Sequence, residues 1–338
     1  MRAVLKPIAA CLASLLLYAL AFGFVLDRPL DLGFLQTQID SKLARAATIE
    51  RAKLVILAGS NGPYSHRCEI IEPIIGMPCI NGGVAVGIGL DYLFARWRRR
   101  LRPGDVVYMP MEETQYVRRR LSTDVGPDAA MMFRHDWHTL ALLPPERWIA
   151  ALFSFDLRSV FMSSMEEALV AIHFRDPRAA VTGTTNAWGD HTGHTAELAA
   201  VSSAGLATIT PHHVSARQIA VGYGTAMIAQ FIRWAAAHGV RVIGGLPTEF
   251  ADAPMPDATL SAIRLTYLSN GGEFLVLPNF SRYPRSAFFD SAEHLNETWQ
   301  AVHSRLLAEQ LRSLLPPSPT IHPVGPATPP AHRNTPTD

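Results

Sequence analysis

The sequence predicts an α/β fold, a flavodoxin-like three-layer sandwich with about five parallel strands. Two observations indicate it. Short apolar segments alternate with helical ones over residues 53–116, and the alternation resumes over residues 215–314. Strands that follow one another through helices form parallel sheets with right-handed crossovers, and ligands bind at the carboxyl ends of these strands. A third observation, an apolar N-terminal segment, adds a transmembrane helix to this fold.

The individual elements are predicted from apolar periodicity and from the residues that end each helix. Pro103 and Gly104 end a helix in the first half, and Gly239 ends a long helix in the second. The first half contains strands over 53–58, 78–81 and 105–109, and helices over 64–75 and 86–101. The second half contains strands over 240–246 and 273–277, and helices over 215–238, 257–269 and 294–314.

The chain divides into a membrane anchor (1–27), an α/β domain (28–315) and a tail (316–338). An insertion at about 117–211 interrupts the domain. For the apolar segment Trp148–Phe153 within it, packing in the core is favoured over contact with a membrane surface. The tail has eight prolines in 23 residues and is predicted to be disordered.

The N-terminal segment is the clearest targeting signal. Arg2 and Lys6 precede an uncharged stretch, residues 8–26, which would span about 28 Å as a helix, close to the hydrocarbon thickness of a bilayer. The positive flank stays in the cytoplasm, which places the rest of the chain outside it. The alternative is a cleaved signal peptide, since Ala19–Ala21 resembles a small-residue cleavage site. We favour the anchor because the apolar run continues beyond that site.

Composition restricts the partners and the compartment. The net charge is +1, with 30 basic and 29 acidic residues, so no overall field attracts nucleic acid and no nucleic-acid partner is expected. Charged residues make up 17% of the chain, a low share that favours a membrane segment. Of three cysteines, Cys68 and Cys79 could pair in an oxidising compartment, but one candidate pair leaves this open.

Ser60 is the candidate nucleophile. It follows the first predicted strand within Gly59–Gly62, where a tight turn exposes its hydroxyl at the carboxyl edge of the sheet. The amides at the start of the next helix point to the same place, and such amides stabilise a developing oxyanion. A serine after a strand is usually an ordinary turn residue, and its hydroxyl needs a base to become nucleophilic.

Asp290 and His294 supply an acid and a base after the last strand, at the predicted start of the last helix. Asp290 can orient one imidazole nitrogen while the other faces Ser60. Alone, a histidine in such a place is usually a capping or surface residue. The combination of a serine after the first strand and an Asp–His pair after the last is more specific than either part.

These segments resemble the SGNH (GDSL-like) hydrolase superfamily. Ala58–Asn61 stands where that family has Gly-Asp-Ser-Leu, and Asn81–Gly83 matches its second block. More narrowly, the chain is similar to a membrane-anchored branch of the family in Pro103–Val107, Asn186–Asp190 and Asp290–Asn296. The similarity implies an SGNH hydrolase fold with Ser60, Asp290 and His294 as the catalytic triad. It also implies oxyanion or substrate-binding roles for Gly82, Asn61 and Asn81.

The third strand departs from the family pattern. The family has an oxyanion asparagine there, whereas this chain has Met109–Glu113 without one. A carboxylate in that place would oppose an oxyanion, so Glu112 or Glu113 must point away, be protonated or act differently. The Asp–His spacing is also one residue longer than usual. We retain Glu112 as a candidate oxyanion or substrate-binding residue.

The resemblance implies a serine ester hydrolase or O-acyltransferase that acts on acylated cell-surface or secreted polysaccharide. It places the protein in the bacterial inner membrane as a single-pass protein with a periplasmic catalytic domain. The branch resembles accessory hydrolases of exopolysaccharide and cellulose biosynthesis, so a polysaccharide-synthase complex is the expected partner. No cofactor is expected. The alternative is a non-catalytic scaffolding or binding subunit of such a complex.

A metal-dependent hydrolase is a third hypothesis. Asp190, His191 and His194 offer metal ligands in one polar loop, and His212 or His213 could join them. The spacing does not define a third ligand, so the sequence predicts no metal site. No phosphate-binding loop and no dinucleotide-binding glycine pattern is present in the sequence.

Overall fold

The computed structural model describes residues 2–20, 30–85, 87–124, 126–152, 185–211 and 213–315, with isolated positions between 161 and 172. Its centre is a sheet of parallel strands in the order β2-β1-β3-β4-β6, which is the flavodoxin-like order. This confirms the predicted α/β class and the five-stranded parallel sheet. The strands are β1 (Leu54–Ile56), β2 (Cys79–Asn81), β3 (Val106–Met109), β4 (Arg241–Gly244) and β6 (Glu273–Phe274).

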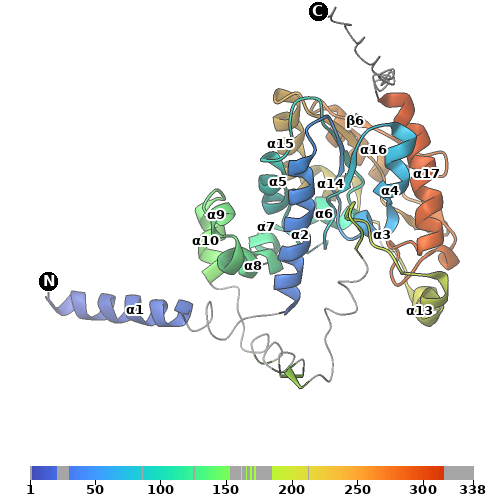
Figure 1. The fold of residues 1–338 in the computed structure, drawn as a ribbon. Helices are drawn as coiled ribbons and strands as arrows, with labels where there is room; N and C mark the ends of the chain where they lie inside the picture. Colours follow the sequence, from blue (N-terminus) through green and yellow to red (C-terminus); the bar gives the residue numbers. More distant parts are fainter. Residues whose placement is uncertain are drawn as a thin grey trace, which may run out of the picture.

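Helices cover both faces of this sheet (Figure 1), with α4 and α17 on one face and α5 and α15 on the other. Alternate residues of β1 serve the two layers, because successive side chains of a strand point to opposite faces. Leu54 and Ile56 pack with α4 and α17, whereas Val55 packs with α5 and α15. The helices of the two halves are α2 (Leu30–Thr48), α3 (Asn61–Ser65), α4 (Cys68–Ile75), α5 (Leu90–Arg98), α14 (Ala216–Val221), α15 (Tyr223–Ala237), α16 (Asp257–Leu268) and α17 (Glu297–Leu314).

The helix predicted over residues 64–75 is two helices, α3 and α4. His66 and Arg67 between them have extended backbones, which end the first helix and begin the second. Cys68 and Cys79 form a disulfide that joins the start of α4 to β2. Closing a loop of this size stabilises a fold by roughly 3 kcal/mol in the chain-entropy model.

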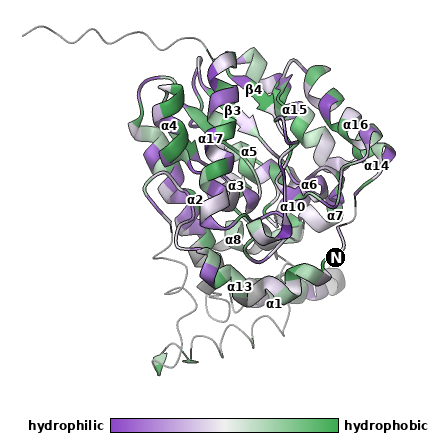
Figure 2. Ribbon diagram, turned by 90° about the vertical axis from the view of Figure 1, so that its right-hand side faces the viewer, coloured by the Kyte–Doolittle hydropathy of each residue, from purple (hydrophilic) through white to green (hydrophobic). Residues whose placement is uncertain are grey.

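The long helix predicted over residues 215–238 is also divided, at Gly222. A Cβ atom on Gly222 would lie 2.2 Å from the carbonyl oxygen of Tyr116, and one on Gly224 would lie 1.7 Å from that of Gln115. The backbone of α6 (Glu113–Val117) therefore occupies the space beside this junction. The shorter helix α14 turns away and packs on α16 (Figure 2).

A buried ion pair joins the residues that directly precede β1 and β3. Lys53 Nζ lies 2.6 Å from Asp105 Oδ2, and both side chains are at most 1% exposed. Asp105 also accepts hydrogen bonds from the backbone amides of Lys53 and Arg102. The carboxylate is thus satisfied on both oxygens, as a buried charge requires.

The insertion contributes helices in two places: α7 to α10 lie together on one side of the molecule, and α13 lies apart from them (Figure 1). Trp148 and Ile149 are 44% and 60% exposed, so the prediction that Trp148–Phe153 packs in the core is wrong for these two residues. Phe133, Trp137 and Leu140 join Trp148 in lining an apolar cavity of about 310 Å³. The helices are α7 (Arg120–Asp124), α8 (Pro127–His135), α9 (Trp137–Leu140), α10 (Pro145–Leu152) and α13 (Ala196–Thr208).

The N-terminal segment forms α1 (Arg2–Leu20). Within the described residues, no helix combines the length and the apolar character that crossing a membrane requires. The end of the predicted anchor, from residue 21 to 27, and the proline-rich tail from residue 316 lie outside the described residues.

Candidate functional site

Ser60 lies at the carboxyl end of β1, where the sequence predicts it. It is the N-cap residue of α3, and its hydroxyl makes no capping hydrogen bond to that helix. The turn before the helix is closed by a hydrogen bond from Gly62 N–H to Gly59 O at 3.0 Å. Ser60 is partly exposed.

Asp290 and His294 form a hydrogen-bonded pair. The carboxylate oxygen Oδ1 of Asp290 lies 2.7 Å from Nδ1 of His294. The loop between them is closed by the hydrogen bond from Phe289 N–H to His294 O at 2.8 Å. The prediction that the last helix begins at His294 is wrong. Helix α17 begins at Glu297, because the side chain of Asn296 caps it by accepting from Trp299 N–H.

Tyr64 brings this pair to the segment that carries Ser60. Its ring stacks on His294 with centroids 4.1 Å apart and on His191 at 4.0 Å on the other side. The next residue, Ser65, donates to the carbonyl of Glu293 at 2.7 Å. The candidate base therefore lies against the first turn of α3, one turn from Ser60. Within the described residues, no hydrogen bond joins Ser60 Oγ to His294.

The sequence analysis did not single out Tyr64, although its position four residues after Ser60 indicates that the two lie on the same side of a helix. Residues four apart on a helix lie on the same face, so an aromatic residue four positions after a nucleophile can reach the same site. Asp290 is more exposed than His294, with side-chain exposures of 43% and 16%. The imidazole of His294 is therefore held by its stacking on Tyr64 as well as by its hydrogen bond to the exposed carboxylate of Asp290.

The amide predicted for the oxyanion hole is engaged elsewhere. Gly82 N–H donates to Ile56 O at 2.8 Å, as part of the ladder between β1 and β2. The prediction that this amide serves as an oxyanion donor is therefore corrected. Gly83 is the residue that faces the nucleophile turn: a Cβ atom there would lie 2.8 Å from Gly62 Cα and 2.9 Å from Gly59 O.

Asn81 and Asn61 are both fully buried and hold the turns of the site together. The Nδ2 group of Asn81 donates to the carbonyls of Gly62 and His66, each at 2.9 Å. The Nδ2 group of Asn61 donates to Pro110 O at 2.7 Å, which ties α3 to the loop after β3. Both side chains therefore position the backbone around Ser60.

Glu112 lies in the place of the missing asparagine. Its side chain is buried, and burial raises its pKa to about 8, with further raising effects from Glu293 and Glu249. A hydrogen bond from Asn61 N–H partly opposes this shift of the pKa. Glu112 is thus protonated at neutral pH, which removes the conflict between a carboxylate and an oxyanion.

A chain of neutral side chains lies beneath Ser60 and ends at the carbonyl of Asn61. His66 Nδ1 lies 3.2 Å from that carbonyl and must carry the proton, since a carbonyl only accepts. His66 Nε2 then accepts from His303 Nε2 at 3.2 Å, and His303 Nδ1 accepts from the hydroxyl of Tyr283 at 2.9 Å. This chain supports the nucleophile turn only while both histidines are neutral.

Acid should weaken the fold through His66. Burial lowers its pKa to about 4, whereas the unfolded chain takes up this proton near pH 6.5. The free energy of unfolding therefore falls as the pH drops from 6.5 towards 4, by about 2.5 kcal/mol at pH 4.5 for this residue. Urea unfolding at pH 7 and pH 4.5 measures this fall in the free energy of unfolding. We expect the fall to be smaller in His66→Gln than in the wild type by about 2.5 kcal/mol. An equal loss in both proteins would contradict the neutral chain.

The residues offered as metal ligands by the sequence do not form a three-ligand group. The carboxylate of Asp190 accepts from the amides of Cys68 and Glu69 and from the side chains of Asn81 and Asn186. It is a structural acceptor at the start of α4. His191 and His194 face each other through their Nδ1 atoms at 3.0 Å. His212 lies outside the described residues.

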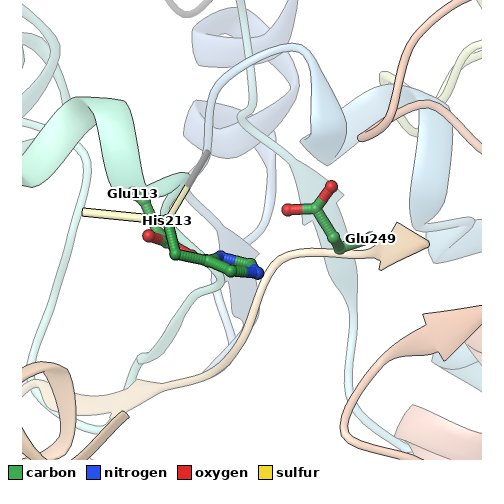
Figure 3. A group of neighbouring side chains, drawn as sticks. All are labelled: Glu113, His213 and Glu249. Carbon is green, nitrogen blue, oxygen red and sulfur yellow. The ribbon is translucent and has the colours of Figure 1, made fainter. Parts of the chain in front are cut away.

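A different group can hold a metal. Glu113, His213 and Glu249 place one ligand atom each within 4.8 Å of one another (Figure 3), and no other such group of three occurs in the described part of the chain. Glu113 begins α6 after β3, and Glu249 lies in the short strand β5 (Glu249–Phe250), which follows β4 and pairs with β7 (Arg282–Tyr283). The group is therefore at the carboxyl edge of the sheet, near Glu112.

No family model, curated protein or solved structure matches the chain. The structure defines the class at the level of its fold: an α/β protein with a five-stranded parallel sheet of flavodoxin-like order. The same sheet edge carries a serine, an Asp–His pair and a buried carboxyl group.

Proposed function

We propose that the protein is a serine ester hydrolase or O-acyltransferase of the SGNH type. One observation carries this proposal: the hydrogen-bonded pair of Asp290 and His294 stacks on Tyr64, one helical turn from Ser60. Nε2 of His294 takes the proton of Ser60 as its hydroxyl oxygen attacks an acyl carbonyl. Asp290 holds the imidazole and stabilises the imidazolium that forms. His294 returns the proton to the departing alcohol oxygen as the ester bond breaks, which leaves the acyl group on Ser60. The acyl group then passes to water or to a second hydroxyl, whose proton His294 takes and returns to Ser60.

The oxyanion of this reaction would lie at the start of α3. The amide of Ser60 is the proposed donor, because Gly82 N–H donates to Ile56 O and Gly83 N–H donates to Asn81 Oδ1. Lys42 Nζ donates to the carbonyl of Gly83 and so fixes the peptide between Gly83 and Val84. Neutral Glu112 leaves the developing negative charge unopposed, so the third-strand departure is compatible with acyl chemistry.

The substrate class and the location remain part of the proposal. The resemblance in the motif segments supports an acylated extracytoplasmic polysaccharide and a polysaccharide-synthase complex as partner. The disulfide of Cys68 and Cys79 supports an oxidising compartment such as the periplasm. The exposed rings of Trp137 and Trp148 support a position beside the inner membrane, with the N-terminal segment as a single-pass anchor.

Labelling with a fluorophosphonate probe tests the proposal, because such probes modify only activated serines. The full chain in detergent micelles should be labelled with one equivalent. Ser60→Ala should lose all labelling, whereas the control Ser269→Ala, at an exposed serine after α16, should keep it. No labelling of the folded wild type would rule out Ser60 as an autonomous nucleophile.

The second candidate is a non-catalytic scaffolding subunit of the same kind of complex. The exposure of Asp290 and the absence of a hydrogen bond between Ser60 and His294 within the described residues favour it. Hydrogen bonds of catalytic groups commonly tighten only when substrate binds, so this geometry is compatible with either candidate. The scaffold function predicts that Ser60→Ala leaves polymer acylation unchanged while deletion of the gene changes it.

A further inference from the structure

We propose that Glu113, His213 and Glu249 form a binding site for a divalent transition-metal ion, Zn²⁺ in the first instance. The three residues come from segments that are 100 and 36 positions apart, and Figure 3 shows their side chains converging. The site is separate from the triad, and the inference does not depend on the activity of Ser60.

The hydrogen bonds of His213 prepare one nitrogen for a cation. Its Nε2 atom lies 3.1 Å from the carbonyl of Ala253, so Nε2 carries a proton that it donates there. Nδ1 then points at Oε1 of Glu113 from 2.7 Å. A lone pair and a carboxylate oxygen at this distance repel each other unless a proton or a cation lies between them. The structure thus leaves room for either an imidazolium or a metal complex.

Glu249 favours the metal complex. It is 8% exposed, and its Oε1 atom is buried without a hydrogen-bond partner in the described part of the chain. The carboxylate is aimed at the other two side chains (Figure 3). Arg282, opposite it in the β5–β7 pair, donates instead to Pro247 O, and none of the ion pairs among the described residues includes Glu249. The charge of Arg282 acts on Glu249 and lowers its pKa, but one buried carboxylate oxygen still lacks a hydrogen bond, a cost that a bound cation would offset.

The ligands also have the outer contacts that metal ligands need. The proton on His213 Nε2 is held by a backbone carbonyl, the usual second contact of a metal-binding histidine. The other oxygen of Glu113 accepts from Val214 N–H at 2.8 Å, which fixes the orientation of that carboxylate. A further carboxyl group, that of Glu293, lies near Glu249 and raises its pKa.

One imidazole nitrogen with two carboxylate oxygens is a ligand set for Zn²⁺, as in catalytic sites with three protein ligands and one open position. Ligand atoms around tetrahedral Zn²⁺ are about 3.3 Å apart. The pair of His213 Nδ1 and Glu113 Oε1 would therefore open from 2.7 Å, and the side chain of Glu249 would close in by at most roughly 1.5 Å. The fourth position would face the carboxyl edge of the sheet and accept water or a substrate oxygen.

Metal binding is measured directly on the full chain in detergent micelles after removal of metal with EDTA. Titration calorimetry with Zn²⁺ should show one equivalent bound. Glu249→Gln and His213→Gln should each weaken binding by at least about 10-fold. The control Glu273→Gln removes a carboxylate of an exposed ion pair with Arg241 and should leave binding unchanged.

Two results would overturn the inference: a folded wild type that binds no Zn²⁺, or binding that both variants retain, which would place the metal elsewhere. X-ray absorption of the Zn²⁺-loaded wild type is independent of how the variants fold. We expect a shell of nitrogen and oxygen with the outer scattering of one imidazole. A shell with two imidazoles would assign the metal to His191 and His194 instead.

Discussion

His294→Ala is expected to lower the rate of probe labelling at Ser60 by about 10²- to 10⁴-fold, the usual contribution of a general base. His294 Nδ1 is bound to Asp290, which leaves Nε2 for the serine proton. Without this base the hydroxyl stays protonated at neutral pH and is a weak nucleophile. The rate constant for labelling is measured by gel fluorescence against time.

Two controls separate catalysis from folding. His238→Ala removes an exposed histidine that ends α15, and its labelling rate should equal that of the wild type. Asp290→Asn keeps the shape of the pair but removes the charge that stabilises the imidazolium, so labelling should slow here too. If His294→Ala labels as fast as the wild type, another group is the base and the triad assignment is wrong.

Lys53→Met should reduce the free energy of unfolding by about 3–5 kcal/mol, the usual cost of removing one partner of a buried ion pair. The carboxylate of Asp105 is 1% exposed and would remain between β1 and β3 with no countercharge. The two backbone amides that it accepts from cannot neutralise it. Urea unfolding of wild type and variant measures the difference.

Arg241→Met is the matched control, because it breaks the pair with Glu273, whose side chains are 37% and 44% exposed. Its effect should stay below about 1 kcal/mol. Adding Asp105→Asn to Lys53→Met should restore part of the lost stability, since the unpaired charge is then removed. A loss below 1 kcal/mol for Lys53→Met would show that water reaches Asp105.

Local sequence was sufficient to predict the class of the fold and to single out three candidate residues, which remain a prediction. The apolar segments at 54–56, 79–81 and 106–109 are strands because helices and turns of the right composition separate them. Ser60 follows the first strand of the sheet, and Asp290 and His294 follow the last one. Parallel strands then place both segments at one sheet edge, so topology alone brings them near each other.

Contacts between distant segments decided the remaining features. The helix over 215–238 is divided because the backbone of α6 approaches Gly222 and Gly224, which no local periodicity records. The amide of Gly82, predicted to be an oxyanion donor, instead donates to Ile56 O of β1. Its neighbour Gly83 faces the turn that carries Ser60 instead.

Local sequence was also insufficient to predict the charge state of Glu112 or the meeting of Glu113, His213 and Glu249. The pKa of Glu112 is raised by burial and by carboxylates more than 130 positions away in the chain. His213 and Glu249 meet Glu113 because segments after β3 and β4 share the carboxyl edge of the sheet. A sequence shows which groups can ionise or bind a metal, whereas burial and distance, which set their chemistry, exist only in the folded chain.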